Sequence, residues 1–335
     1  MSREISKEEM GKVLHYICSD RLTGNRTEEA RHMINEGADV NARDVKGRTP
    51  LFVSREPELT QLLIAKGADV NAQDRWGDTP LHLSRNLQQT QALIEAGADV
   101  NLSNYEGQTP LHTNSDEERS ICLVEAGAHM HATDKKGNTP LHGHCSAGKA
   151  FFFLENGADV NAKNNAGETP LFLATDDVKL SKVLLQAGAD VNARDENGTS
   201  PLHHARDEAK VRLLIENGAN VNARDEFGQT PLHCVRSEAK VRLLIENEAD
   251  VNAQDRNGDT PLHCVMEVDS ARLLIQAGAD VNARNNAGAP TFHVQSVIRP
   301  DVASIIKTEI DRRALQANVV QAQPQPIKKK AKAYI

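Results

Sequence analysis

The chain has 335 residues, of which 39% are hydrophobic and 26% charged, and its formal net charge is −8. The longest purely apolar run, residues 150–154, is far too short to span a bilayer, and the first residues lack the apolar core of a secretory leader, so we expect no membrane association. An acidic chain is a poor ligand for phosphate backbones, so we also expect no nucleic-acid binding.

Cysteine usage points to a reducing compartment. The five cysteines form an odd set without the regular spacing of a disulfide framework: Cys18, Cys122, Cys145, Cys234 and Cys264. We therefore expect a cytoplasmic protein. Because the cysteines are far apart in the sequence, we interpret them as small packing residues and not as partners in disulfides.

The first 43 residues predict two helices, over residues 8–18 and 27–36, followed by the sequence GADVN at residues 37–41. They lack the tetrapeptide TPLH that recurs later in the chain. We interpret residues 1–43 as the N-terminal cap of a repeat array, because a terminal unit meets water on one face and departs from the common pattern.

Residues 44–284 contain eight copies of one unit. The proline of the TPLH core recurs every 30 residues with a single step of 31, at Pro50, Pro80, Pro110, Pro140, Pro170, Pro201, Pro231 and Pro261. A fixed period of this kind indicates a solenoid, in which one unit cannot bury its apolar face alone and neighbours must stack.

One unit can be interpreted residue by residue. Thr230 as N-cap and Pro231 at the first helical position predict a short first helix, and the apolar spacing of Val241, Leu244 and Ile245 predicts a second helix over residues 238–247. A glycine such as Gly218 ends the second helix in a left-handed conformation. Extended chain then leads into the turn of the next unit.

Two departures from the pattern carry predictions about stability. Glu248 stands where the other units have the helix-ending glycine, so it should adopt a left-handed backbone at a cost of about 1 kcal/mol. The third unit has a polar first helix and is followed by a histidine-rich hairpin. We therefore expect residues 109–148 to open first in hydrogen exchange.

The repeat pattern decays from residue 285, where residues 289–293 keep the register with Thr and Pro exchanged. We interpret residues 285–316 as the C-terminal cap, with a last helix over residues 301–315. Residues 317–335 are rich in Gln, Pro and Lys and predict a disordered basic tail. Its lysines resemble a short nuclear import signal: Lys328, Lys329, Lys330 and Lys332.

The chain resembles the ankyrin-repeat family. The resemblance rests on the motif D-x-x-G-x-T-P-L-H at residues 74–82 and 134–142, and on the hairpin sequence GADVNA at residues 67–72 and 157–162. It implies an all-α solenoid, a curved and elongated array of helix–turn–helix units joined by β-hairpins. Units in the family have about 33 residues, so these are shorter, and the missing residues lie between the two helices. The first helix should therefore be clipped.

Seven histidines occupy one motif position: His82, His112, His142, His203, His233, His263 and His293. The resemblance implies that they bond the motif Thr and neighbouring backbone, a structural role. A second group differs, because His129 and His131 replace hairpin Asp and Asn and are followed by His144 and Cys145. These four could converge on one zinc ion, although exposed imidazoles in a drifting repeat are the simpler interpretation.

No nucleophile elbow, phosphate loop, zinc-protease motif or separate carboxylate pair is present, so we expect neither an enzyme nor a cofactor. Recognition should use positions at which the units differ. Aromatic side chains stand at the turn tips in Trp76, Tyr105 and Phe227, and arginines end the first helices in two adjacent pairs, Arg55 with Arg85 and Arg206 with Arg236. Stacking would hold the guanidinium groups of each pair about 10 Å apart.

These observations predict a non-catalytic scaffold, monomeric, that binds a partner protein on a concave face of turn tips and first helices. Two alternatives remain at this point. Shortened repeats resemble those of ankyrin effectors that intracellular bacteria deliver into the host cytosol, and the cluster of residues 129–145 would make a metal-binding module.

Overall fold

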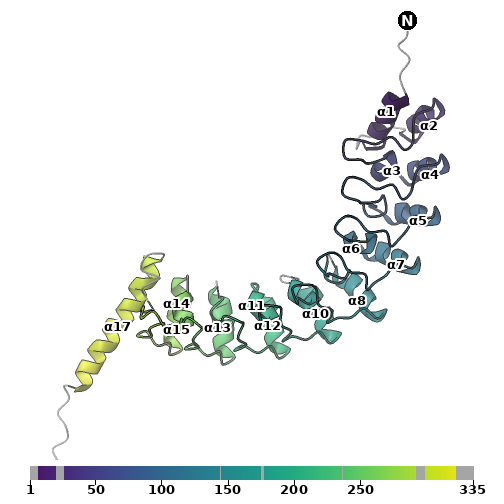
Figure 1. The fold of residues 1–335 in the computed structure, drawn as a ribbon. Helices are drawn as coiled ribbons and strands as arrows, with labels where there is room; N and C mark the ends of the chain where they lie inside the picture. Colours follow the sequence, from purple (N-terminus) through teal and green to yellow (C-terminus); the bar gives the residue numbers. More distant parts are fainter. Residues whose placement is uncertain are drawn as a thin grey trace, which may run out of the picture. The chain divides into compact units, whose positions relative to one another are not determined.

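The structure is a computed structural model that describes residues 7–19, 26–143, 145–174, 177–235, 237–291 and 299–321. Within these ranges the regular elements are all helices (Figure 1). Their bounds are α1 (Lys7–Ser19), α2 (Arg26–Asn35), α3 (Pro50–Val53), α4 (Pro57–Ala65), α5 (Leu87–Glu95), α6 (Pro110–Thr113), α7 (Glu117–Glu125), α8 (Ala147–Glu155), α9 (Pro170–Leu173), α10 (Val178–Gln186), α11 (Pro201–His204), α12 (Glu208–Glu216), α13 (Glu238–Glu246), α14 (Pro261–Cys264), α15 (Val268–Gln276) and α17 (Pro300–Gln321).

Five units pair a very short first helix with a second helix of nine residues, as in α3 and α4. Proline at the first position of α3 needs no hydrogen-bond partner, and the backbone N–H of Ser54 already closes the helix on the carbonyl of Pro50. The first helix is therefore clipped to one turn, as the short period predicts.

In three units even this turn is not helical, at residues 80–83, 140–142 and 231–234. The prediction of a first helix at Leu232 is therefore wrong. The backbone N–H groups of His233 and Cys234 bond the carbonyls three residues earlier, at 2.9 and 3.3 Å, which makes a tight turn. A segment this short cannot add the further bonds that would propagate a helix.

The hairpins between units contain no strand in the described ranges, apart from an isolated bridge between Arg284 and Pro290. The hairpins close with a backbone bond at the base, for example from the N–H of Asp44 to the carbonyl of Arg48 at 2.9 Å and from that of Asp225 to the carbonyl of Gln229 at 3.0 Å. Inside it, the carboxylate of Asp44 accepts from the N–H groups of Lys46 and Arg48, both at 2.8 Å. The expected β-hairpin is thus a side-chain-capped turn, too short for a ladder of its own.

The helices at the two ends differ from the repeated pair. Helices α1 and α2 pack on each other and on α3 and α4 in place of a regular unit. Helix α17 packs on α15 and has 22 residues. It runs to Gln321, past residue 315 where the last helix was predicted to end, so residues 317–321 are helical and the prediction of a disordered tail from residue 317 is wrong for them. None of the described helices is both long and apolar enough to cross a membrane.

The chain divides into two compact units, Met1–Glu196 and Asn197–Ile335. In the first, α4, α5, α7, α8 and α10 stack in succession, and in the second α12, α13, α15 and α17 do so (Figure 1). Each stack buries the same two positions of every unit. Leu111 of the TPLH motif and Leu123 of the second helix, for example, are 0% and 2% exposed. Apolar side chains of neighbouring units therefore form one continuous core in each stack.

Candidate functional site

The turns are joined tip to tip through the backbone. The N–H of Tyr105 donates to the carbonyl of Trp76 at 2.9 Å, and the N–H of Arg256 donates to the carbonyl of Phe227 at 2.8 Å. The same bond joins each pair of successive turns within the two compact units, and we call this series the turn ladder. The ladder uses only main-chain groups, so it does not depend on which side chain stands at a tip, although Asn165 and Asn286 also donate side-chain bonds to the preceding turn.

The glycine that follows each tip lets the next turn approach. Gly77 has a φ of 79°, and a Cβ there would lie 2.7 Å from the backbone nitrogen of Tyr105. Any side chain would therefore be strained and would push the two turns apart.

Trp76 and Tyr105, both in the first compact unit, pack partly on the preceding turn. The guanidinium of Arg48 lies 5.2 Å from the ring centre of Trp76, and the Tyr105 ring covers Gly77. Arg48 is itself held by the buried carboxylate of Asp74, from Nε to Oδ2 at 3.0 Å. Trp76 nevertheless stays 46% exposed and Tyr105 58% exposed. Their rings are thus positioned by neighbours and still open to a ligand.

The remaining predicted contact residues are distributed over both compact units. Phe227 is 59% exposed at its tip, and Arg206 is exposed at the end of α11. Arg55 is half-buried, and Arg85 is exposed in the following unit. Arg236 lies outside the described residues. The pairing of Arg206 with Arg236 therefore remains a prediction.

The motif histidines join successive units. In the described part of the chain they share one geometry, shown by His112: its Nδ1 accepts from the backbone N–H of Thr109 at 3.1 Å, and its Nε2 faces the carbonyl of Asn138 at 3.0 Å. A carbonyl only accepts, so Nε2 carries the proton and the ring is neutral. Burial lowers the pKa of His112 and of the equivalent His82, His142, His203 and His233. His293 lies outside the described residues.

A family sequence model, described as ankyrin repeats in three copies, matches residues 53–122, 114–195, 145–225 and 202–285. These matches cover more than half of the chain and follow the repeats seen in the structure. The chain is a member of the ankyrin-repeat family. No curated protein matches it.

Ankyrin repeats are generally protein-interaction modules, and the family is typically non-catalytic. The thiols of this ankyrin chain agree with a packing role. Burial raises the pKa of Cys18 and Cys264 to about 12 and that of Cys145 to about 11. These three groups are therefore protonated at neutral pH and poor nucleophiles.

The predicted zinc cluster is not assembled in the described part of this ankyrin array. His129 and His131 are exposed, Cys145 is buried, and His144 lies outside the described residues. No group of three His, Cys, Asp or Glu side chains that could hold a metal occurs among the residues described.

The ankyrin units also contain buried cations that the sequence analysis missed. Lys149 in α8 is fully buried, and its Nζ donates to the carbonyls of Leu111, at 3.2 Å, and Asn114 in the preceding unit. Lys240 in α13 does the same with the carbonyls of His203, at 3.3 Å, and Ala205, at 2.8 Å. Burial lowers the pKa of both lysines to about 8.

A sequence signal for these lysines existed. The third residue of the second helix is long and polar in several units, and in α5 it is Gln89, whose Nε2 donates to the carbonyl of Ser54 at 2.8 Å. A helix pattern alone places such residues on the wet face. The signal is that a long polar side chain recurs at the same helix position in several units, which indicates a bond to the previous unit.

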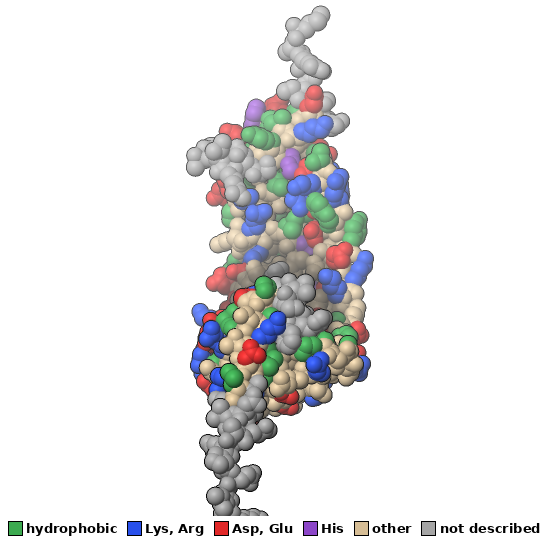
Figure 2. Space-filling model, turned by 90° about the vertical axis from the view of Figure 1, so that its left-hand side faces the viewer, with side chains coloured by type: hydrophobic (Ala, Val, Ile, Leu, Met, Phe, Trp, Pro, Cys, Tyr) green, Lys and Arg blue, Asp and Glu red, His purple; other side chains and the backbone are tan. Residues whose placement is uncertain are grey.

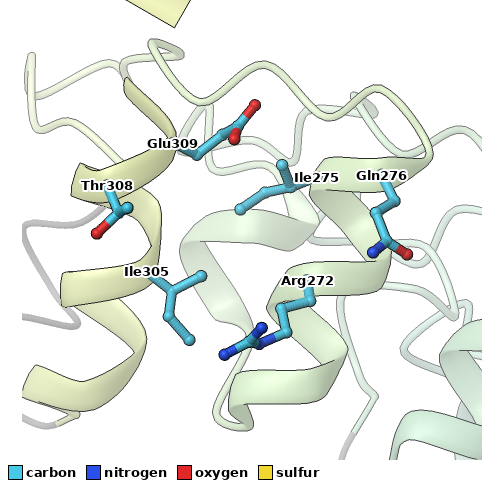
Figure 3. Close-up of a pocket in the computed structure, with 6 residues that line it drawn as sticks. All are labelled: Arg272, Ile275, Gln276, Ile305, Thr308 and Glu309. Carbon is cyan, nitrogen blue, oxygen red and sulfur yellow. The ribbon is translucent and has the colours of Figure 1, made fainter. Parts of the chain in front are cut away.

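The face in Figure 2 does not concentrate one type of side chain: basic, acidic and hydrophobic groups are interspersed there. A cavity of about 340 Å³ lies between α15 and α17. In Figure 3, Ile305 and Glu309 of α17 face Arg272 and Ile275 of α15 across it. Glu309 is already paired with Arg312 and Arg313, at 2.7 and 2.8 Å, so this cavity belongs to the packing of the C-terminal helix of the ankyrin array.

Proposed function

We propose that this ankyrin-repeat chain is a non-catalytic scaffold that binds a partner protein through its turn tips and the ends of its first helices. One observation carries the proposal: the turn ladder joins successive tips through main-chain atoms whatever their side chains, and aromatic rings stand exposed on it. Exposed aromatic residues are enriched at the centres of protein interfaces.

Affinity capture with the full chain tests the proposal. Trp76→Ala and Phe227→Ala should each weaken capture of the partner about tenfold or more, because large aromatic anchors dominate binding energy. Phe151→Ala is the matched control, since Phe151 is 58% exposed but lies on the second helix α8. The proposal would be contradicted if both tip variants captured as much partner as the wild type, or if Phe151→Ala lost as much capture as they do.

Cytoplasmic residence, a monomeric state and nuclear import through the lysines of residues 328–332 are further parts of the proposal. The lysines lie outside the described residues, and their support is the basic composition of the segment. A fluorescent fusion that stays in the cytosol after its import machinery has been shown to work would contradict import. Delivery into a host cell as an effector rests only on the shortened repeats.

A further inference from the structure

A cavity of about 470 Å³ opens beside the tip of Phe227 in the compact unit Asn197–Ile335. Its lining includes two cations, Arg206 and Lys240, with the Phe227 ring as an apolar wall. One carboxylate, that of Asp225, also lines it. Its Oδ1 already accepts from the backbone N–H groups of Phe227 and Gln229, at 2.9 and 2.8 Å.

Lys240 supplies an unused donor to this cavity. An ammonium group has three N–H donors, and two of them reach the carbonyls of His203 and Ala205. The side chain is only 3% exposed and lines the cavity, so water has little access to the third donor. A buried cation is stabilised when an anion completes its hydrogen bonds.

Arg206 places a second positive charge at the edge of the cavity. It is exposed and has no hydrogen bond or ion pair with any residue that the structure describes. One oxygen of Asp225 is engaged by backbone amides, and the cavity places two cationic donors and an aromatic surface against this single carboxylate. That combination is complementary to a carboxylate next to an apolar side chain.

We infer that this cavity receives an aspartate or glutamate side chain of an acidic segment in the partner protein, with an adjacent apolar side chain resting on Phe227. The inference rests on the proposed function and names the chemistry of the partner. The carboxylate would accept hydrogen bonds from the third N–H of Lys240 and from the guanidinium of Arg206, both of which line the cavity.

The chain provides a natural control in its first compact unit. Lys149 is buried and bonded like Lys240, but the positions that correspond to Arg206 and Phe227 hold Ser115 and Lys136. The same buried lysine therefore occurs without the arginine and without the aromatic wall. It should contribute to stability and not to recognition.

The test uses the full chain and two rhodamine-labelled, capped peptides, one alternating leucine with glutamate and one alternating leucine with glutamine, in fluorescence polarisation. We expect the glutamate peptide to bind at least tenfold more tightly, with affinity falling as salt rises. Arg206→Ala and Lys240→Met should each weaken it about tenfold, whereas Lys149→Met should leave it within twofold.

Arg206→Ala keeps the experiment interpretable, because an exposed side chain can be removed without a folding defect, and circular dichroism verifies each variant. Equal binding of the two peptides, an unchanged affinity in Arg206→Ala, or an equal loss in Lys149→Met would overturn the inference. A phosphoserine peptide that binds more than tenfold better than the glutamate peptide would overturn the carboxylate assignment. If peptide binding fails while capture still depends on Trp76 and Phe227, the cavity assignment is wrong and the proposed scaffold function stands.

Discussion

The motif histidine shows how much one side chain does in each unit. In His203, Nδ1 accepts from the N–H of Ser200 at 3.1 Å, and Nε2 donates to the carbonyl of Gln229 at 3.2 Å in the next unit. If Nδ1 were protonated, its N–H would face the N–H of Ser200, and two donors cannot form a hydrogen bond, so the first bond would break. The ring can therefore join two units only while it is neutral.

We predict that stability falls as the pH drops below about 6.5. Burial lowers the folded-state pKa of five motif histidines below their ordinary value of 6.5, so the unfolded chain binds protons that the folded chain does not. Their contribution is complete above 6.5 and is lost as the pH falls toward the folded-state values. Urea unfolding at pH 7.5 and 5.5 should show a lower midpoint at 5.5, and identical midpoints would contradict this.

Glu248 is the only described residue other than glycine with a positive φ, of 65°, as its place in the repeat predicts. Glu248→Gly should raise the free energy of unfolding by about 1 kcal/mol, because glycine adopts this conformation without strain. Gly278→Ala is the reciprocal control: its φ is 96°, and a Cβ there would meet nothing within 4 Å, so only backbone strain changes. Denaturant unfolding that leaves Glu248→Gly unchanged would show that the strain is relieved elsewhere.

At the scale of the hairpin, an asparagine joins neighbouring units. The side chain of Asn101 donates to the carbonyl of Gly127 at 3.0 Å and accepts from the N–H of His129 at 2.9 Å. Asn41, Asn222 and Asn252 make the equivalent pair. His131 takes this position in its own unit and makes no such pair with any residue described. One joint of the first compact unit is therefore missing its bridge.

His131→Asn should stabilise the chain by about 1 kcal/mol, because it restores two hydrogen bonds at an exposed joint. Thermal unfolding measures the gain, and Asn101→His, which removes a bridge that is present, should cost a similar amount. Adding zinc to the wild type tests the metal-binding alternative. If zinc raises the unfolding temperature of the wild type but not that of His131→Asn, His131 binds a metal, contrary to the geometry of the described residues.

Across the whole molecule, burial in the second helices is uneven. Helix α7 buries only Ser120 and Leu123, whereas α13 buries Val241, Leu243 and Leu244 together with Lys240. Fewer buried apolar side chains lower the free energy of local opening. The weak helix and the missing bridge at His131 fall in the same stretch of the first compact unit.

Hydrogen exchange should therefore find opening first within residues 109–148, with the amides of α7 exchanging faster than those of α13. Mass spectrometry of peptides from each helix measures this directly, and His131→Asn should slow the exchange of α7 specifically. If α13 exchanges first, buried apolar area does not set the order of opening in this chain.

The repeat period and the motif predicted the fold well, because each unit repeats the same local signals: N-cap, proline, apolar pair and left-handed glycine. Sequence did not predict the exact secondary structure of short segments, such as the turn at residues 231–234, since a few residues cannot express a periodicity. It also missed Lys240, because a lysine is buried only when a neighbouring unit supplies its acceptors. The proposed contact residues differ from unit to unit and are visible in the sequence, but the cavity beside Phe227 exists only once neighbouring units pack.

The turn ladder has a consequence for how such a protein can change over generations. The donor in each bond is the backbone N–H of the first tip residue of a turn. These residues are as unlike as Arg75, Tyr105 and Glu226, yet each supplies the same amide hydrogen. Nineteen of the genetically encoded amino acids satisfy this requirement, and proline, lacking the hydrogen, is the one that does not. New specificities can therefore be acquired at the tips by substitution while the architecture beneath them is inherited intact.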